Sequence, residues 1–213
     1  MIGRVDDVAN FKMEDLTPCV EYPFCLQSKM CWSKNVLDER DAPNQILLGA
    51  ADPNFCVLLA LAIHLEHQLG NGGIDLAADK RFLFGIKKGV AAKFFNDTVG
   101  MEDFVMLARG QLGTHSIRKF LSTHARRNGC SRDDVNARGR WKRAKQIVDS
   151  YIDVTLLYPD AKVAAVLCVG GPIKYTVRDG VSISADWIVQ FVVPNIAIHF
   201  PRALAVVLGR ALL

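Results

Sequence analysis

His115 and Arg118 lie three positions apart in a stretch whose pattern predicts a helix over residues 114–128, so both side chains point to one side of that helix. A guanidinium donates paired hydrogen bonds to phosphate oxygens and stays charged at any working pH, and an imidazole can accept or donate a proton. Trp141 offers a neutral N–H donor, and Tyr151, ten residues further on, carries a hydroxyl that can act as a nucleophile. Together these residue types favour chemistry at a phosphorus atom.

Positive charge is concentrated in the same part of the chain. Residues 118–145 contain ten Lys or Arg residues and two acids, a local net charge of +8, whereas the whole chain has a net charge of +4 and its other 185 residues therefore carry −4. This distribution is typical of a surface that binds phosphates, and a solvated helix face without a ligand is the alternative. The candidate DNA-binding residues are Lys119, Arg126, Arg127, Arg138, Arg140, Lys142, Arg143 and Lys145.

Five short boxes, in order along the chain, resemble the catalytic domain of tyrosine recombinases, the phage-integrase superfamily, and most closely its Crypton-type branch. Residues 3–16 resemble the family's first arginine box, and residues 32–35 resemble the hairpin that presents its lysine. A His-x-x-Arg box, a Gly-x-Trp stretch that resembles the Gly-Trp box and a tyrosine follow at about the family's separations. The residues that match the family's catalytic set are Arg4, Lys34, His115, Arg118, Trp141 and Tyr151.

The resemblance implies that Tyr151 attacks a DNA phosphate and holds the strand as a 3′-phosphotyrosine, which a 5′ hydroxyl can reverse without ATP. Arg4 and Arg118 would stabilise the negative charge that builds on the non-bridging oxygens. Lys34 would protonate the departing 5′ oxygen, and Lys29 is the alternative for this role.

The two remaining members of the set have less defined roles. His115 would hydrogen-bond the phosphate or help to deprotonate Tyr151. Trp141 would donate its indole N–H while its ring packs the site. The resemblance implies neither a metal ion nor another cofactor.

The same resemblance implies double-stranded DNA as the partner, no membrane, and an intracellular, nuclear location. Family members carry a separate N-terminal helical domain that closes around DNA. Because this chain begins at the first arginine box, we expect that domain to be absent and DNA binding to be weaker and more sensitive to salt.

The expected domains are a recombinase-like catalytic domain over residues 1–170 and a helical extension over residues 171–213. The last helix is either core or an element exchanged between the protomers of a homo-oligomer.

Three other interpretations remain open at this point. One is a truncated or domesticated relative that binds DNA without cutting it. A second is an enzyme of the type IB topoisomerase kind, which uses the same chemistry but relaxes supercoils as a monomer. The third is a structural protein in which the boxes are accidental.

The elements that must position these residues follow from apolar spacing, caps and breakers. Residues 22–36 are expected to be extended, with a short strand near residues 81–85. Asp52 is expected to cap one helix and Ser131 another. Helices are predicted over residues 5–16, 55–69, 90–99, 103–109, 114–128, 145–153, 159–169, 184–192 and 201–213, with another starting at residue 131. The predicted fold class is mainly α with a small antiparallel β-sheet, an α+β domain similar to the recombinase catalytic domain.

Composition excludes several broad classes of protein. Half of the residues are apolar and the mean hydropathy is +0.15, so the chain can bury a core and is not disordered. Residues 1–7 hold charges and lack the apolar core of a secretory signal peptide, so secretion is not expected. The apolar stretch 192–213 is broken by prolines and arginines, so it is not expected to span a membrane. The six cysteines show no Cys-x-x-Cys pair, so reduced thiols are expected, and His64 and His67 are expected to be ordinary core or surface residues.

Overall fold

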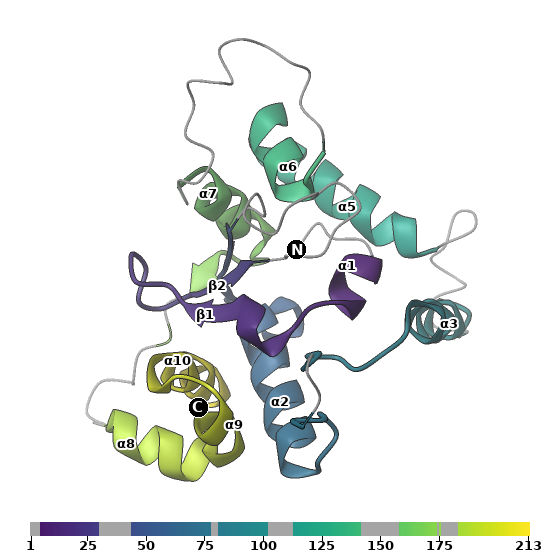
Figure 1. Cartoon of the computed structure of the whole chain (residues 1–213). Helices are drawn as coiled ribbons and strands as arrows, with labels where there is room; N and C mark the ends of the chain where they lie inside the picture. The colour runs from purple at the N-terminus through teal and green to yellow at the C-terminus, as the bar shows by residue number, and fades with distance from the viewer. Residues whose placement is uncertain are drawn as a thin grey trace.

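The computed structural model describes residues 5–29, 44–77, 81–101, 113–141, 158–173, 175 and 183–213 (Figure 1). Helices account for most of these residues, and the strands form two small antiparallel sheets. The predicted α+β class, mainly helical with a small antiparallel sheet, is therefore confirmed. Within these ranges, no helix has the length and apolar character needed to cross a membrane.

The N-terminal segment leaves the helical conformation earlier than its apolar spacing predicts. Three short elements replace the helix expected over residues 5–16: α1 (Val5–Ala9), the 3-10 turn η1 (Met13–Asp15) and β1 (Leu16–Pro18). The Leu83 N–H donates to the Phe11 carbonyl at 2.8 Å, and the Met13 N–H donates to the Arg81 carbonyl at 2.8 Å. This extended pairing buries both Phe11 and Met13 in the core, and the predicted helix over residues 5–16 is wrong beyond Ala9.

The larger sheet contains β1, β2 (Leu26–Lys29) and β3 (Asn44–Leu47) in that order. Leu26 lies opposite Leu47, so the two buried side chains meet on neighbouring strands. The smaller sheet pairs β4 (Gly49–Ala50) with β5 (Pro172–Ile173). Of the predicted extended stretch, residues 26–29 form β2, and residues 30–36 lie outside the described residues. The predicted strand near residues 81–85 is an isolated bridge between Lys12 and Phe82.

The main core lies between α2 (Val57–Gly70) and the C-terminal helices, below the sheet in Figure 1. A 3-10 turn, η3 (Pro53–Phe55), precedes α2, and the Asp52 carboxylate accepts a hydrogen bond from the Asn54 N–H at 2.9 Å. The predicted cap therefore closes this turn, while the Cys56 thiol caps α2 by accepting from the Leu59 N–H. The helix consequently starts two residues later than predicted.

Four C-terminal helical elements complete this core: α8 (Ala185–Trp187), the π-helix η5 (Ile188–Val192), α9 (Pro194–His199) and α10 (Arg202–Leu212). Leu204 and Leu208 of α10 are fully buried against α2, which contributes Leu58 and Leu65. The apolar face of α10 is therefore core, and exchange of this helix between protomers is not supported. Residues 183–213 share one hydrophobic core with the preceding part of the chain.

A second helical layer lies on the opposite side of the sheet, at the top of Figure 1. It consists of α5 (Thr114–Arg127), α6 (Arg132–Gly139) and α7 (Tyr158–Leu167), and α3 (Lys88–Val99) flanks it beside α1 and α5. A small separate core of Ala125, Cys130, Val135 and Val163 joins the three helices. These helices agree with the predicted ones to within two residues, whereas those predicted over residues 103–109 and 145–153 lie outside the described part of the chain.

Candidate nucleic-acid interface

α5 is a strongly basic helix that contains no acidic residue. A reciprocal pair of hydrogen bonds caps its start: the Ser116 N–H donates to the Gly113 carbonyl at 2.8 Å, and the Gly113 N–H donates to the Ser116 hydroxyl at 3.1 Å. Its outward residues include His115, Lys119, Arg126 and Arg127, all of which are exposed. Because no carboxylate of this helix offsets these charges, its outer face attracts anions.

Arg118 is the member of α5 that connects the helix to a second predicted box. Its Nη2 donates to the Gly139 carbonyl at 2.6 Å, and its guanidinium carbon lies 4.5 Å from the centre of the Trp141 ring. A guanidinium over an indole face is a favourable cation–π contact that restricts the orientation of both groups. The structure therefore brings together Arg118 and Trp141, two residues 23 positions apart that the sequence proposed for the same site.

Gly139 fits this arrangement because its lack of a side chain makes room for the indole. A Cβ at Gly139 would lie 2.2 Å from the Trp141 ring, closer than any real contact. The backbone N–H of Trp141 donates to the Asn136 carbonyl at 3.0 Å, which holds the turn after α6. Gly139, Arg118 and Trp141 thus form a closed group in which each member contacts the other two.

Arg140, between Gly139 and Trp141, points away from the basic surface and into the protein. Its Nη2 lies 2.5 Å from the Asp7 Oδ2, and the two side chains are 4% and 3% exposed. The residue adopts the left-handed conformation with φ of 53° at the end of α6. The ion pair joins α6 to α1, the helix that directly follows Arg4 in the chain.

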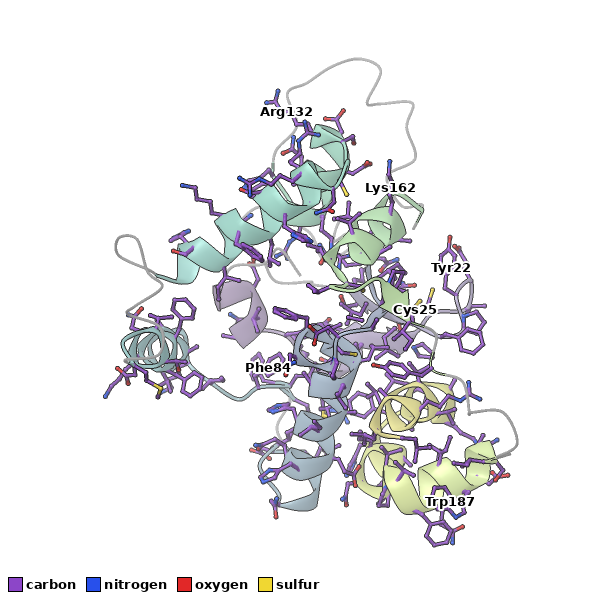
Figure 2. The ribbon with its side chains drawn as sticks, turned by 180° about the vertical axis from the view of Figure 1, so that it is seen from behind. Tyr22, Cys25, Phe84, Arg132, Lys162 and Trp187 are labelled. Atoms are coloured by element: carbon purple, nitrogen blue, oxygen red, sulfur yellow. The ribbon has the colours of Figure 1, made fainter. Side chains whose placement is uncertain are left out.

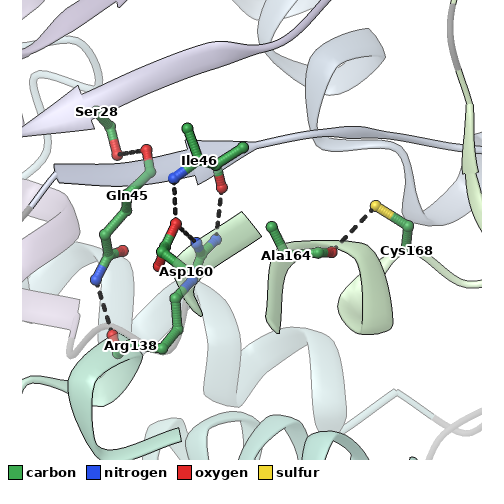
Figure 3. Close-up of polar contacts among 7 residues, drawn as sticks. All are labelled: Ser28, Gln45, Ile46, Arg138, Asp160, Ala164 and Cys168. Carbon is green, nitrogen blue, oxygen red and sulfur yellow. Dashed lines mark hydrogen bonds and ion pairs between the residues drawn. The ribbon is translucent and has the colours of Figure 1, made fainter. Parts of the chain in front are cut away.

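Arg138 is buried in a second polar network, shown in Figure 3. Its Nη1 lies 2.5 Å from the Asp160 Oδ2, its Nη2 donates to the Ile46 carbonyl at 2.8 Å, and the Ile46 N–H donates to the same Asp160 carboxylate. Gln45 Nε2 donates to the Arg138 carbonyl at 2.8 Å. These contacts hold α6, α7 and β3 together.

The eight predicted DNA-binding bases therefore divide into three groups. Lys119, Arg126 and Arg127 lie exposed on α5, and Arg126 also donates to the Cys130 carbonyl at 2.5 Å. Arg138 and Arg140 are buried in ion pairs, and in this structure they do not belong to the exposed surface on which the sequence placed them. Lys142, Arg143 and Lys145 lie outside the described residues.

The predicted catalytic residues divide in a similar way. His115 and Arg118 share α5, and Trp141 contacts Arg118. Three others, Arg4, Lys34 and Tyr151, lie outside the described residues. Lys29, the alternative to Lys34, is a half-buried residue at the end of β2 opposite Asn44.

Sequence reasoning missed the acids that neutralise the two buried arginines. Asp160 and Asp7 are 22 and 133 positions from their partners, so a count of local charge could not identify them. One local signal was available for Arg138, which follows the buried Val135 at a spacing of three and therefore shares its inward face.

An exposed aromatic residue on α5 was also missed. Phe120 is exposed, and its ring stacks on that of His124 with 5.8 Å between the ring centres. Aromatic rings beside basic residues are frequent contacts for nucleic-acid bases and sugars. The spacing of four on a predicted basic helix could have identified this pair.

Other reactive side chains of the described residues have structural roles. The Tyr175 hydroxyl lies 2.8 Å from the Cys56 sulfur, and burial, together with this hydrogen bond, raises the pKa of Tyr175 above its usual value. Since a raised pKa leaves less phenolate at neutral pH, Tyr175 is a poor nucleophile. The imidazole of His64 is hydrogen-bonded to the Leu83 carbonyl at 2.9 Å, as expected of a core histidine.

The cysteines that the structure describes have the properties of buried structural thiols. Burial raises the pKa of Cys168 to about 11 and that of Cys25 to about 12, so both thiols are protonated at neutral pH. The five cysteines in the described ranges are free thiols, and no group of three or more potential metal ligands occurs in those ranges. Among the described residues, the candidate site therefore consists of the basic face of α5 and the Arg118–Trp141 contact.

Comparison of this chain with protein-family models, with curated proteins and with solved structures finds no match. The case for a function consequently depends on the residues and their geometry.

Proposed function

We propose that this chain is the catalytic domain of a tyrosine recombinase that cleaves and rejoins DNA through a 3′-phosphotyrosine intermediate. The observation that carries the proposal is the contact of Arg118 with Trp141 beside a helix face that holds only basic charges. A guanidinium fixed in this way is ready to receive a phosphate without reordering its long side chain.

In the proposed reaction, the Tyr151 oxygen forms a bond to phosphorus as the bond from phosphorus to the 5′ oxygen breaks. Arg118 and Arg4 donate hydrogen bonds to the non-bridging oxygens, where negative charge increases in the transition state. Lys34 gives its proton to the departing 5′ oxygen. A 5′ hydroxyl then attacks the phosphotyrosine, restores the phosphodiester and releases the phenol, so no external energy source is needed.

His115 and Trp141 support this chemistry at the same phosphate. His115 stands one helical turn before Arg118 on α5, so both side chains extend from neighbouring positions of one face. It takes the Tyr151 proton or hydrogen-bonds the phosphate. Trp141 contributes its indole N–H, and its ring restricts the Arg118 guanidinium.

We propose duplex DNA as the substrate and the outer face of α5 as its binding surface. Lys119, Arg126 and Arg127 lie on this face and would neutralise backbone phosphates on either side of the scissile one. The contribution of these charges depends on the release of counterions, so affinity should fall steeply as salt rises.

The test is covalent trapping on a DNA duplex that carries a nick next to the scissile phosphate, so that the released fragment diffuses away. The chain should form a protein–DNA adduct that resists denaturation, and Tyr151→Phe should abolish it. The matched control is Tyr22→Phe, which removes the hydroxyl of an exposed tyrosine at the turn between β1 and β2 and should leave the adduct unchanged.

The other outcomes separate the alternatives. Salt-sensitive DNA binding without an adduct from any of a set of duplexes would indicate a binding domain that does not cut. Relaxation of supercoiled DNA without joined recombinant products would indicate topoisomerase activity. Absence of both binding and adduct would overturn the proposal.

A further inference from the structure

The turn between α6 and Trp141 contains an arginine where a glycine would be the easier residue. Among the residues that the structure describes, Arg140 alone has a positive φ without being glycine, and this left-handed conformation is unfavourable for a residue with a Cβ. The turn that follows α5 uses a glycine, Gly129 with φ of 85°, for its left-handed residue. The arginine side chain therefore supplies something that a glycine at this position would not.

That contribution is a buried connection to another part of the chain. The Arg140 guanidinium lies 2.5 Å from the Asp7 carboxylate, and both side chains are more than nine-tenths buried. An ion pair in such surroundings is directional, and removal of one partner takes away the charge that the other faces in the interior. The pair therefore holds the end of α6 at a defined place against α1.

The same turn holds Gly139 and Trp141, the two residues that contact Arg118 at the candidate phosphate site. The residue before Arg140 is Gly139, whose carbonyl accepts from Arg118 at 2.6 Å. The residue after it is Trp141, whose ring lies 4.5 Å from the Arg118 guanidinium carbon. A shift of the Arg140 backbone would move these two partners of Arg118 together.

We propose that Arg140 is a positioning residue that, through its ion pair with Asp7, sets the orientation of Arg118 and Trp141 for phosphate binding. The inference rests on the proposed function, because the groups that it orients are those proposed to hold the scissile phosphate. Arg140 itself contacts no DNA in this proposal. Its buried charge is used within the protein, unlike the exposed charges of α5.

The first measurement is the fluorine NMR signal of 5-fluorotryptophan at position 141, in a chain where Trp32→Phe and Trp187→Phe leave it as the sole tryptophan. Arg140→Gly should move this signal toward its position in Arg118→Ala, because the turn is still allowed but its connection to Asp7 is lost. Arg140→Lys, which keeps a charge for Asp7, should return the signal part of the way. Arg132→Gln, at an exposed position of the same helix, should leave it unchanged.

The second measurement is affinity for a DNA duplex at fixed salt. Arg140→Gly should weaken binding about tenfold, the effect of losing one well-oriented hydrogen bond to a charged group. Arg140→Lys should recover part of this loss. An Arg140→Gly chain whose fluorine signal and affinity both match those of the parent would overturn the inference.

A further variant covers loss of folding. If Arg140→Gly does not fold because Asp7 is left charged and buried, the double change Asp7→Ala with Arg140→Gly removes both charges. A folded double variant should still show the displaced tryptophan signal and the weaker binding, whereas parental values for both would contradict the proposal. A double variant that also failed to fold would show that the pair maintains the fold as a whole, and would contradict a role confined to the site.

These outcomes also separate this inference from the proposed function. The fluorine signal requires no DNA, so a displaced signal in a chain whose parent binds no DNA would support positioning and refute the DNA proposal. Unchanged signal and affinity in variants of a parent that binds and cleaves DNA would refute positioning alone.

Discussion

The core between α2 and α10 is built from apolar side chains such as Leu58, Leu65 and Leu208. In the layer of α5, α6 and α7, by contrast, the Arg138–Asp160 ion pair joins α6 to α7, and the buried Arg140–Asp7 ion pair joins the layer to α1. Hydrophobic burial stabilises without strong direction, and an ion pair fixes the relative placement of two groups at little net gain in stability. In Figure 2 Arg132 of α6 and Trp187 of α8, one residue from each region, lie at opposite ends of the molecule.

This contrast indicates that the two regions have different structural roles. The α2 and α10 region supplies most of the fully buried apolar side chains and therefore most of the folding free energy. The α5 layer has a small core of four buried residues of its own, and Ala164 of α7 packs against buried residues of the sheet region. Arg138 and Arg140 add polar connections from this layer to β3 and α1. We infer that the second region is arranged for placement of charges and the first for stability.

The largest effect is expected where the ion-pair network is broken on one side. Asp160→Ala leaves the Arg138 guanidinium buried without its carboxylate and should lower the free energy of unfolding by about 3–5 kcal/mol. Urea denaturation followed by circular dichroism measures this change. Replacement of both partners, Asp160→Leu with Arg138→Met, should restore part of the loss, because the buried charge is removed while the Ile46 N–H and carbonyl still lose their partners. A double variant less stable than Asp160→Ala would contradict this expectation.

A truncation in the apolar core tests the other region. Leu208 is fully buried between α10 and α2, so Leu208→Ala should lower the unfolding free energy by about 2–5 kcal/mol, through lost burial and the cavity that remains. Leu213→Ala at the exposed end of the chain should change it by less than about 0.5 kcal/mol. A small effect of Leu208→Ala, together with a dimer that dissociates, would instead place this face between protomers.

Removal of a surface arginine should weaken DNA binding when the residue lies on α5 and not when it lies on α10. Arg127→Gln at the exposed end of α5 should reduce the slope of log affinity against log salt by about 1, with little change in stability. Arg202→Gln removes an exposed arginine of α10, which is paired with Asp186, and should leave the slope as it is. Equal slopes for all three chains would show that the α5 face does not contact phosphates.

The smallest expected effect is a loss of stability at alkaline pH that originates in the apolar region. Burial raises the pKa of Cys168 to about 11 from 9.0, so between these values the folded chain holds a proton that the unfolded chain releases. The contribution of the protonated Cys168 thiol to the free energy of unfolding is therefore fully present below about pH 9 and is lost as the pH rises toward 11. Denaturation curves between pH 8 and pH 11 should show this decline, and Cys168→Ala should reduce it; an identical decline in the variant would assign it to other groups.

Local signals predicted the helices well because helix starts depend on neighbouring residues. Ser131 caps α6 as expected, with its hydroxyl accepting from the Asp134 N–H at 3.0 Å. The predicted helix over residues 5–16 was wrong beyond Ala9, since pairing of residues 11–13 with residues 81–83 overrides the local apolar spacing.

The candidate site was predictable only in part, for a similar reason. The spacing of His115 and Arg118 placed both on one helix, and the boxes proposed Trp141 for the same site; in the structure Trp141 contacts Arg118. Whether a basic residue faces solvent depends on acids elsewhere in the chain, which is why Arg138 and Arg140 could not be separated from Lys119 by counting charge.

The central claim is that a phosphate held beside Arg118 is attacked by Tyr151, and mass spectrometry of the trapped adduct tests it most directly. After digestion by nuclease and protease, the account predicts a nucleotide attached to the peptide that contains Tyr151, and its loss in both Tyr151→Phe and Arg118→Ala. A nucleotide on any other residue, or an adduct that persists in Tyr151→Phe, would contradict it.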